Sequence, residues 1–414
     1  MGTLRTILVP AACALVALGL AMLATPGLWH SGKPGSDTAL YARYGESVAH
    51  GLVPYRDFFL EYPPGALAAI VPPALVTRDA TSYSDLFVAE MVGVLILTIV
   101  VTAATLASLG MSRRRMIFSL APLATAPLLL GSLSAQRYDL FPALLTAVAL
   151  LLSVRRLDVA AGGVLGLGTA AKLYPALLLP IIAVLAYRRG GGRRSAGAVA
   201  AFALVALAIF VPFVSLSPDG IGHMLRYQLA RPLQVETLGA SAALVMHVVV
   251  GFSVGLTSGY GTTNLGGARG QAIALLQGLL TVGVLGWIVW RMRRCARDAG
   301  EAVLCAAAIV CATVALGRVL SPQFVIWLLP VVPLVDGIVG VSATACLLVA
   351  TGLTRLWYDR FYGNVVPGLN PLGISVLLLR NTMLLGLLAL LLVEFAKSPA
   401  RKAVSAKPLG RARQ

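Results

Sequence analysis

Three acidic residues gather in one polar segment near the start of the chain, where they could do chemistry. Asp37, Asp57 and Glu61 all follow the first apolar stretch within a few turns of chain. A carboxylate beside a hydroxyl group can take its proton, and carboxylate oxygens also suit Mg²⁺ or Mn²⁺. The spacing leaves plainer roles open, because Asp37 could cap a helix and Arg56 could pair with Asp57 or Glu61.

The residues around Asp37 predict a surface helix. Ser36 or Asp37 would be its N-cap, and the helix would run to about His50. Tyrosines on one helical face typically anchor a helix at a membrane interface, so we expect this one to lie on the membrane. The apolar and aromatic residues that share this face are Leu40, Tyr41, Tyr44 and Val48.

Four other motifs combine a basic residue with an aromatic residue or a proline at the end of an apolar stretch. They are QRYDLFPA (136–143), KLYPALLLP (172–180), YQLARPLQVET (227–237) and GRVLSPQFVIWLLP (317–330). One such motif alone usually anchors a span at the membrane interface. Together, their four basic residues would surround one site with positive charge, which suits an anionic group such as a phosphate.

Arg380 lies inside the last apolar stretch. A charged residue at that depth is a candidate functional residue, because charge is costly inside a membrane. Glu90, near the outer end of the second apolar stretch, is a candidate partner for it.

No cofactor motif accompanies these residues. The sequence contains no P-loop, no GxGxxG and no HExxH, and its five cysteines lack the spacing of a zinc site. We predict no cofactor and no metal, and a divalent cation held by Asp37, Asp57 and Glu61 stays open as an alternative. An enzyme on the outer face of a membrane would then need an activated donor carried by the membrane.

The elements that must position these residues are membrane spans. Of the 414 residues, 58% are hydrophobic and 12% are charged, whereas a soluble domain has about 25% charged residues. Apolar stretches long enough to cross a bilayer recur along the chain, without a soluble domain or a flexible linker. We predict one all-α polytopic membrane domain over residues 1–396, with an uncleaved first span, and a basic cytoplasmic tail over residues 397–414.

Charge decides how often the chain crosses the membrane. Residues 64–80 are apolar but short, and Pro72 and Pro73 should break a helix there. If this segment does not cross, 20 of the 33 Lys and Arg residues lie inside; if it does, only 11 do. The positive-inside rule favours the first arrangement, with both termini cytoplasmic. The twelve predicted spans are 6–28, 85–109, 116–132, 139–154, 159–171, 173–187, 195–214, 271–290, 301–317, 322–335, 338–354 and 372–396.

Two long segments, 29–84 and 215–270, then lie on the outer face. In the second, residues 241–257 are apolar, and we expect a helix on or partly inside that face. The net charge of +17 comes largely from the short inner loops, so we predict a bilayer partner and no nucleic acid.

In their order along the chain, these motifs resemble those of glycosyltransferase family 87. The resemblance extends from about residue 35 to 335 and implies a GT-C-like bundle of about 12 transmembrane helices, with interfacial helices in the first outer loop. The ordered set consists of Asp37 with Tyr41, PYRDF (54–58), EYPP (61–64), QRYDLFPA, KLYPALLLP, RPLQ (231–234) and SPQFVIWLLP (321–330).

The resemblance also implies an activity. The chain would be a polyprenyl-phosphate-sugar-dependent hexosyltransferase of a bacterial plasma membrane, similar to the family's mannosyltransferases of cell-envelope glycolipids. Such an enzyme transfers a sugar, here mannose, from a polyprenyl-phosphate donor to a lipid or glycan hydroxyl on the outer face. The catalytic Asp of the family lies in the first outer loop, and Asp37 matches it by position as the general base of an inverting mechanism.

The chain departs from the family at one motif. Well-characterised members carry a His-rich segment after Ser-Pro, whereas Gln323 and Phe324 follow Ser321 and Pro322 here, which leaves the acceptor and the sugar open. For the donor phosphate we predict Arg231, Arg318, Lys172, Arg137 and, deeper in the membrane, Arg380. For the sugar or the acceptor we predict Tyr41, Asp57, Glu61, Tyr62, Tyr138, Asp139, Gln234 and Gln323.

Three other functions remain open at this point. The chain could be a transporter or flippase of a lipid-linked sugar, an arabinofuranosyltransferase of the same fold, or a non-catalytic assembly factor. No internal repeat is evident, and the polar motifs lie near one surface rather than at mid-membrane, which argues against a transporter.

Overall fold

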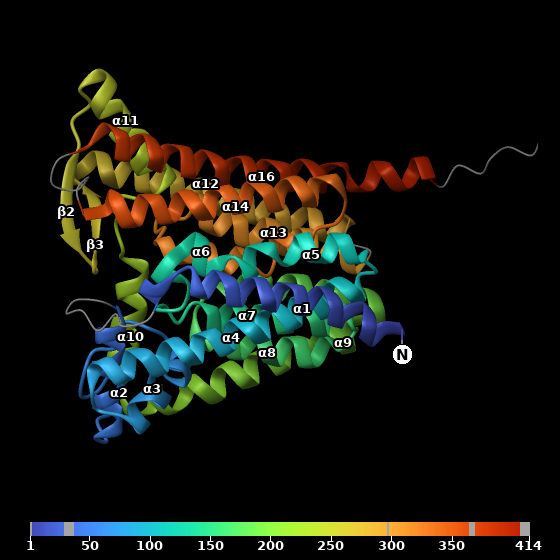
Figure 1. Ribbon diagram of the computed structural model, residues 1–414, viewed down its shortest axis with the longest axis horizontal. Coiled ribbons are helices and arrows are strands. Elements are labelled where there is room, and N and C mark those ends of the chain that lie inside the picture. Colours follow the sequence, from blue (N-terminus) through green and yellow to red (C-terminus); the bar gives the residue numbers. More distant parts are fainter. Residues whose placement is uncertain (1, 29–36, 296–297, 364–368, 406–414) are drawn as a thin grey trace, which may run out of the picture.

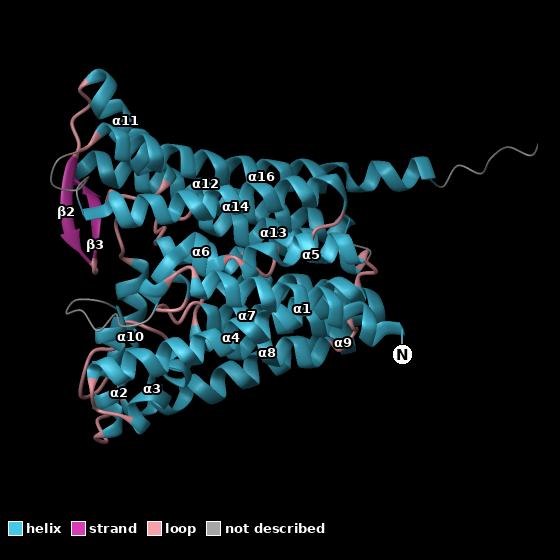
Figure 2. Cartoon of the chain, viewed as in Figure 1, coloured by secondary structure: helices cyan, strands magenta, loops and turns pink. Residues whose placement is uncertain are grey.

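A computed structural model describes residues 2–28, 37–295, 298–363 and 369–405, and it consists almost entirely of helices (Figures 1 and 2). In this part of the chain, eight helical stretches are long and apolar enough to cross a membrane. The protein is therefore an all-α polytopic membrane protein, as predicted. The helices that form these stretches are α1 (Gly2–Leu23), α4 (Ala80–Ser108), α5 (Arg113–Ala124) with α6 (Ala126–Leu130) and η3 (Gly131–Ser134), η4 (Tyr174–Leu178) with α9 (Leu179–Leu216), α12 (Gly267–Cys295), α13 (Ala299–Leu316), α14 (Gly337–Arg360) and α16 (Pro371–Ser405).

The longest helix, α9, is in fact two antiparallel helices. Gly190 and Gly191 have non-helical backbone angles, and Gly191 has a φ of 70°. The Ser195 hydroxyl donates to the carbonyl of Ala183 at 3.0 Å, although a continuous helix would hold residues 12 apart at about 18 Å. With this reversal, each of the twelve predicted spans corresponds to a helical segment. The shorter segments are α7 (Leu140–Val154), α8 (Asp158–Ala171), η5 (Pro322–Leu328) and η6 (Val332–Leu334).

The predicted span over residues 322–335 is not an α-helix. It consists of the two 3-10 helices η5 and η6. Pro330 and Pro333 explain the interruption, because each lacks a backbone N–H and its ring clashes with the preceding turn.

Helix α8 packs closely on the second half of α9. At Gly162 and Gly166, an added Cβ would collide with the carbonyl groups of Ala198 and Phe202. Small residues four apart allow such close approach between membrane helices. This contact fixes the position of the C-terminal end of α8, which carries Lys172.

Basic loops collect at the end of the bundle that also holds the N-terminus, which we call the basic end (Figure 1). There Asp158 forms ion pairs with Arg189 at 2.7 Å and Arg194 at 2.8 Å. Arg188 donates to the carbonyl of Arg293 at 2.6 Å, which joins the turn inside α9 to the end of α12.

The opposite end carries the strands and most of the short helices, and we call it the strand end (Figures 1 and 2). Its three strands form an antiparallel sheet in the order β1-β3-β2. The elements at this end are η1 (Pro26–Leu28), α2 (Asp37–Ala49), η2 (Pro64–Ala66), α3 (Leu67–Val76), α10 (Pro218–Leu229), β1 (Leu233–Gln234), α11 (Leu238–Val250), β2 (Gly255–Gly259) and β3 (Thr262–Gly266).

Helix α2 confirms the predicted helix to about His50, but Tyr41 points into the bundle and not toward the membrane surface. Ser36, one of the two candidate caps, lies outside the described residues. The Tyr41 ring is 1% exposed and lies 5.3 Å from the ring of Phe87 in α4. The prediction that Tyr41 anchors α2 to lipid was therefore wrong, because this ring fills the interior of the bundle.

Helix α3 also differs from its prediction. It continues through Pro72 and Pro73, which were expected to break it. Contacts with α2 and α4 hold this helix in place: Ile70 accepts a hydrogen bond at its carbonyl from the Tyr83 hydroxyl at 2.8 Å, and Ala74 contacts Gly45 of α2. The segment 64–76 thus lies beside α2 at the strand end (Figure 1).

The apolar segment 241–257 is only partly helical. Helix α11 ends at Val250, and residues 255–266 form the hairpin of β2 and β3. Gly251, with a φ of 70°, ends the helix, and the turn at Tyr260 and Gly261 reverses the chain.

Candidate active site

Two of the cavities at the strand end are lined by Asp37. The smaller has a volume of about 260 Å³ and the larger about 490 Å³. Molecules in the two cavities would therefore meet at this carboxylate. The residues that line both cavities are Asp37, Gly261, Thr262, Ser321 and Gln323.

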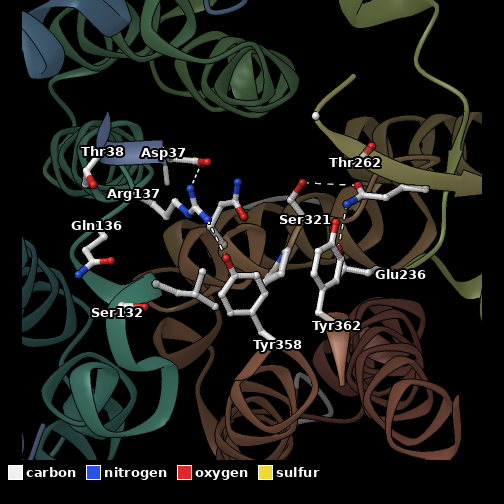
Figure 3. A pocket seen from close by; sticks show the side chains of 15 residues that line it. Asp37, Thr38, Ser132, Gln136, Arg137, Glu236, Thr262, Ser321, Tyr358 and Tyr362 are labelled. Atoms are coloured by element: carbon white, nitrogen blue, oxygen red, sulfur yellow. Dashed lines mark hydrogen bonds and ion pairs between the residues drawn. The ribbon is translucent and has the colours of Figure 1, made fainter. Parts of the chain in front are cut away.

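Asp37, the first residue of α2, forms an ion pair with Arg137 (Figure 3). Arg137 in turn donates from Nη2 to the Tyr358 hydroxyl of α14 at 3.2 Å. The Asp37 side chain remains 30% exposed. Asp37 is therefore a carboxylate that lies beside a cation and is open to both cavities.

Lys172 brings a buried cation to the larger cavity. Its Nζ lies 2.6 Å from Oδ1 of Asp139, and the same oxygen accepts a hydrogen bond from Nε1 of Trp327 at 2.7 Å. The rings of Tyr138, Phe324 and Trp327 lie 4.7–5.2 Å from Nζ, within the range of cation–π contacts. These contacts hold the ammonium group in one position beneath the cavity.

Arg231 lines the same cavity. Its guanidinium group forms no hydrogen bond or ion pair with any residue that the structure describes. It is therefore a cation available to a ligand. Glu61, Tyr62, Tyr138 and Gln323, which were predicted to bind the sugar or the acceptor, also line this cavity.

Glu236 belongs to the smaller cavity and was missed from the sequence. Its side chain is 0% exposed, and it accepts hydrogen bonds from Nε1 of Trp357 at 2.7 Å and Nε2 of Gln234 at 2.9 Å. Arg380 donates to its backbone carbonyl at 2.8 Å. Burial, opposed in part by the nearby Arg380 charge and by these donors, raises the pKa of Glu236 to about 7.

Gln234 links this buried group to the wall that the two cavities share. Its Oε1 accepts a hydrogen bond from the backbone N–H of Leu320 at 3.1 Å and lies 3.5 Å from the Ser321 hydroxyl. Gln234 lines the smaller cavity, as expected for a ligand-binding residue, but its amide is already occupied by protein groups.

The deep arginine has a different partner from the one predicted. Arg380 is 0% exposed and contacts Glu236, not Glu90, so the proposed pairing with Glu90 was wrong. The reason is that the partner comes from a segment between α10 and α11 that the sequence did not place beside α16.

Other predicted residues lie outside both linings. Asp57 is bound to Arg56 at 2.9 Å and to the N–H of Val53 at 2.7 Å, and Arg318 donates to the carbonyl of Leu229 at 2.9 Å. Asp139, Tyr41 and Arg380 lie behind the residues that line the cavities. Among the described residues, no three His, Cys, Asp or Glu side chains gather into a group that could hold a metal ion.

Residues that the sequence did not indicate complete the linings. Tyr358 comes from the end of α14 and Tyr362 lies just beyond it, and Tyr260 and Thr262 come from the β2–β3 hairpin. Only GYGTTN (259–264) carried a usable signal, because a glycine-containing pair between short polar runs favours a hairpin turn.

Comparisons with known proteins bear on this site. The model of glycosyltransferase family 87 matches residues 59–322. No curated protein matches the chain. The solved structure of ArnT from Cupriavidus metallidurans bound to undecaprenyl phosphate is similar over 96% of this chain and 79% of that chain, with 14% sequence identity and a TM-score of 0.49.

The family match includes Arg137, Lys172 and Arg231, whereas Asp37 precedes it. It covers more than half of the chain, on a structure with eight helices that could cross a membrane among its described residues. This protein is a membrane glycosyltransferase that belongs to glycosyltransferase family 87.

Proposed function

We propose that the protein transfers a sugar, mannose by preference, from a polyprenyl-phosphate donor to a hydroxyl group of a lipid or glycan acceptor. Asp37 is the general base. The observation that carries this proposal is that Asp37 lines two cavities. The larger is also lined by the cations Arg43, Lys172 and Arg231, whereas the basic residue in the described lining of the smaller is Arg137, which is paired with Asp37.

The reaction is a direct displacement. The acceptor oxygen attacks the anomeric carbon of the donor sugar while Asp37 takes the hydroxyl proton. The bond between that carbon and the phosphate oxygen breaks with its electron pair, so polyprenyl phosphate leaves and the anomeric configuration inverts. Base catalysis of this kind contributes about 10² to 10⁴-fold to the rate.

Lys172 and Arg231 bind the donor phosphate in this proposal. Negative charge on the phosphate grows as the bond breaks, and cations that are already in position stabilise it. Arg137, first predicted as a phosphate ligand, instead keeps Asp37 ionised and oriented. Glu61, Tyr62, Tyr138 and Gln323 are the residues for the sugar.

An apolar groove between α9 and α12 supports a lipid-linked donor. It has a volume of about 510 Å³, begins at Ala176 just after Lys172, and extends toward Trp290 and Arg293 near the basic end. A polyprenyl chain in this groove would leave its phosphate near Lys172. The acceptor occupies the smaller cavity, with its reacting hydroxyl at Asp37.

We propose that the strand end faces outward and both termini face the cytoplasm of a bacterial cell. The positive-inside rule supports this orientation, since Arg189, Arg194 and Arg293 lie at the opposite end. Labelling of single cysteines at positions 79 and 190 in intact cells tests it, because only position 79 should react from outside.

The test of the base is Asp37→Asn in proteoliposomes that contain polyprenyl-phosphate mannose and total lipid from the producing organism. Release of polyprenyl phosphate and formation of a mannosylated lipid should both fall at least a hundredfold. Glu46→Gln, a carboxylate on the same helix outside both cavities, is the matched control and should stay within twofold of the unsubstituted protein. Near-normal turnover of the Asp37 variant would sink the assignment.

A further inference from the structure

The β2–β3 hairpin carries an aromatic side chain to the wall between the two cavities. Gly261 and Thr262, at its tip, line both cavities, and Tyr260 lines the larger one together with Arg231 and Gln323. No other strand turn in the described part of the chain reaches this wall.

The backbone at the tip is unfavourable for a tyrosine. Tyr260 has a φ of 58° and Gly261 a φ of 67° in a two-residue turn between the paired residues Gly259 and Thr262. Such turns favour Asn-Gly, because Asn tolerates positive φ far better than a bulky residue does. A non-glycine residue persists in this strained conformation where the surrounding structure holds it, which points to a function for the ring.

The hairpin is fixed to the segment that bears the cationic site. Strand β3 pairs with β1, which begins at Leu233, two residues after Arg231, and the Val235 N–H donates to the Thr263 carbonyl at 3.0 Å. Within the tip, Nδ2 of Asn264 donates to the Gly259 carbonyl at 3.0 Å. The Tyr260 ring therefore has a set position relative to Arg231.

A second aromatic ring supports Tyr260 from the side. The Tyr227 ring of α10 lies 4.6 Å from it, and Phe59 lies 5.2 Å beyond Tyr227. This row restrains the ring in place, while its membership in the cavity lining leaves it in reach of a ligand.

We propose that Tyr260 is a sugar-binding residue on which the donor's sugar ring stacks, next to the phosphate held by Lys172 and Arg231. The C–H groups on one face of a sugar are apolar and suit the face of an aromatic ring, whereas its hydroxyls suit Glu61 and Gln323. Tyr260 thereby favours the glycosylated lipid over the bare lipid phosphate that remains after transfer. This inference rests on the proposed function of the larger cavity.

The experiment compares two lipids in binding to the purified full-length protein in nanodiscs. One is polyprenyl-phosphate mannose, with the arabinofuranose analogue as a second sugar, and the other is sugar-free polyprenyl phosphate of the same length. Tyr260→Asn removes the ring and relieves the turn, so the hairpin should persist. We expect its affinity for the preferred sugar lipid to fall about three- to tenfold, while its affinity for the bare phosphate stays within twofold.

Two further variants make the outcome unambiguous. Tyr260→Phe keeps the ring and should retain most of the preference for the sugar lipid, and Ser258→Ala alters the same hairpin away from the cavities. An equal preference in Tyr260→Asn and the unsubstituted protein overturns the inference, and so does an equal loss for both lipids, which would mean that the tip only supports the fold. Failure of the proposed function has a different signature, namely that the unsubstituted protein forms no mannosylated lipid from polyprenyl-phosphate mannose.

Discussion

Two aspartates at opposite ends of the bundle bind arginines in different ways. Asp158 at the basic end is buried, and both of its oxygens are occupied, by Arg189 at 2.7 Å and Arg194 at 2.8 Å. Asp37 at the strand end pairs with Arg137 and keeps 30% of its side chain exposed between two cavities. A closed cluster joins segments of the fold, whereas an open pair leaves a carboxylate accessible to a ligand.

The substitution with the largest expected effect, Asp37→Asn, tests whether the two aspartates differ in role. We expect turnover to fall about 10² to 10⁴-fold, because the amide cannot take the acceptor proton. The thermal unfolding midpoint should change little, since the site is partly exposed. A loss of stability with turnover per folded molecule retained would make Asp37 a structural residue like Asp158.

Asp158→Asn should show the reverse pattern. Two arginines would lose a buried counter-charge, which destabilises the fold by about 3–5 kcal/mol. Thermal unfolding in detergent measures the loss, and the remaining folded protein should transfer sugar at the normal rate. Normal stability in this variant would show that the basic end does not depend on the closed cluster.

Lys172→Met tests the ion pair of Lys172 with Asp139, which is buried like the Asp158 cluster but reaches a cavity like Asp37. Its Nζ contacts buried Asp139 yet also reaches the larger cavity. Loss of this charge-assisted contact should weaken polyprenyl phosphate binding by about ten- to a hundredfold, or about 1.5–3 kcal/mol. Arg318 was also predicted to bind the phosphate, but it lines neither cavity, so Arg318→Met should leave this binding unchanged. A loss comparable to that of Lys172→Met would show that Arg318 is a phosphate ligand after all.

The smallest expected effect concerns pH. The pKa of Glu236 is raised to about 7, above its usual value of 4.5, so the folded state holds this proton more tightly than the unfolded state. The stability that it contributes is complete below about pH 4.5 and is lost as the pH rises through 7. In Glu236→Gln, the unfolding midpoint should therefore fall less between pH 5 and pH 8 than in the unsubstituted protein. Parallel pH profiles would contradict the shift.

Composition and the length of the apolar stretches were enough to predict the spans, because crossing a bilayer requires long apolar helices. Motif order was enough to bring Lys172, Arg231 and Asp37 to one end of the bundle. Contacts between segments that are distant in the sequence could not be predicted, because no local pattern indicates that Arg380 contacts Glu236. The same limit hid the direction of Tyr41, whose helical face could suit either lipid or the interior of the bundle.

The reversal at Gly190 and Gly191 decides how many times the chain crosses the bundle between Lys172 and Arg231. An unbroken 38-residue helix would be about 57 Å long and would overshoot the bilayer. With one crossing fewer, Arg231 and everything after it would emerge on the side opposite Lys172. The reversal at these two glycines is therefore what allows Lys172, before α9, and Arg231, after it, to line the same cavity.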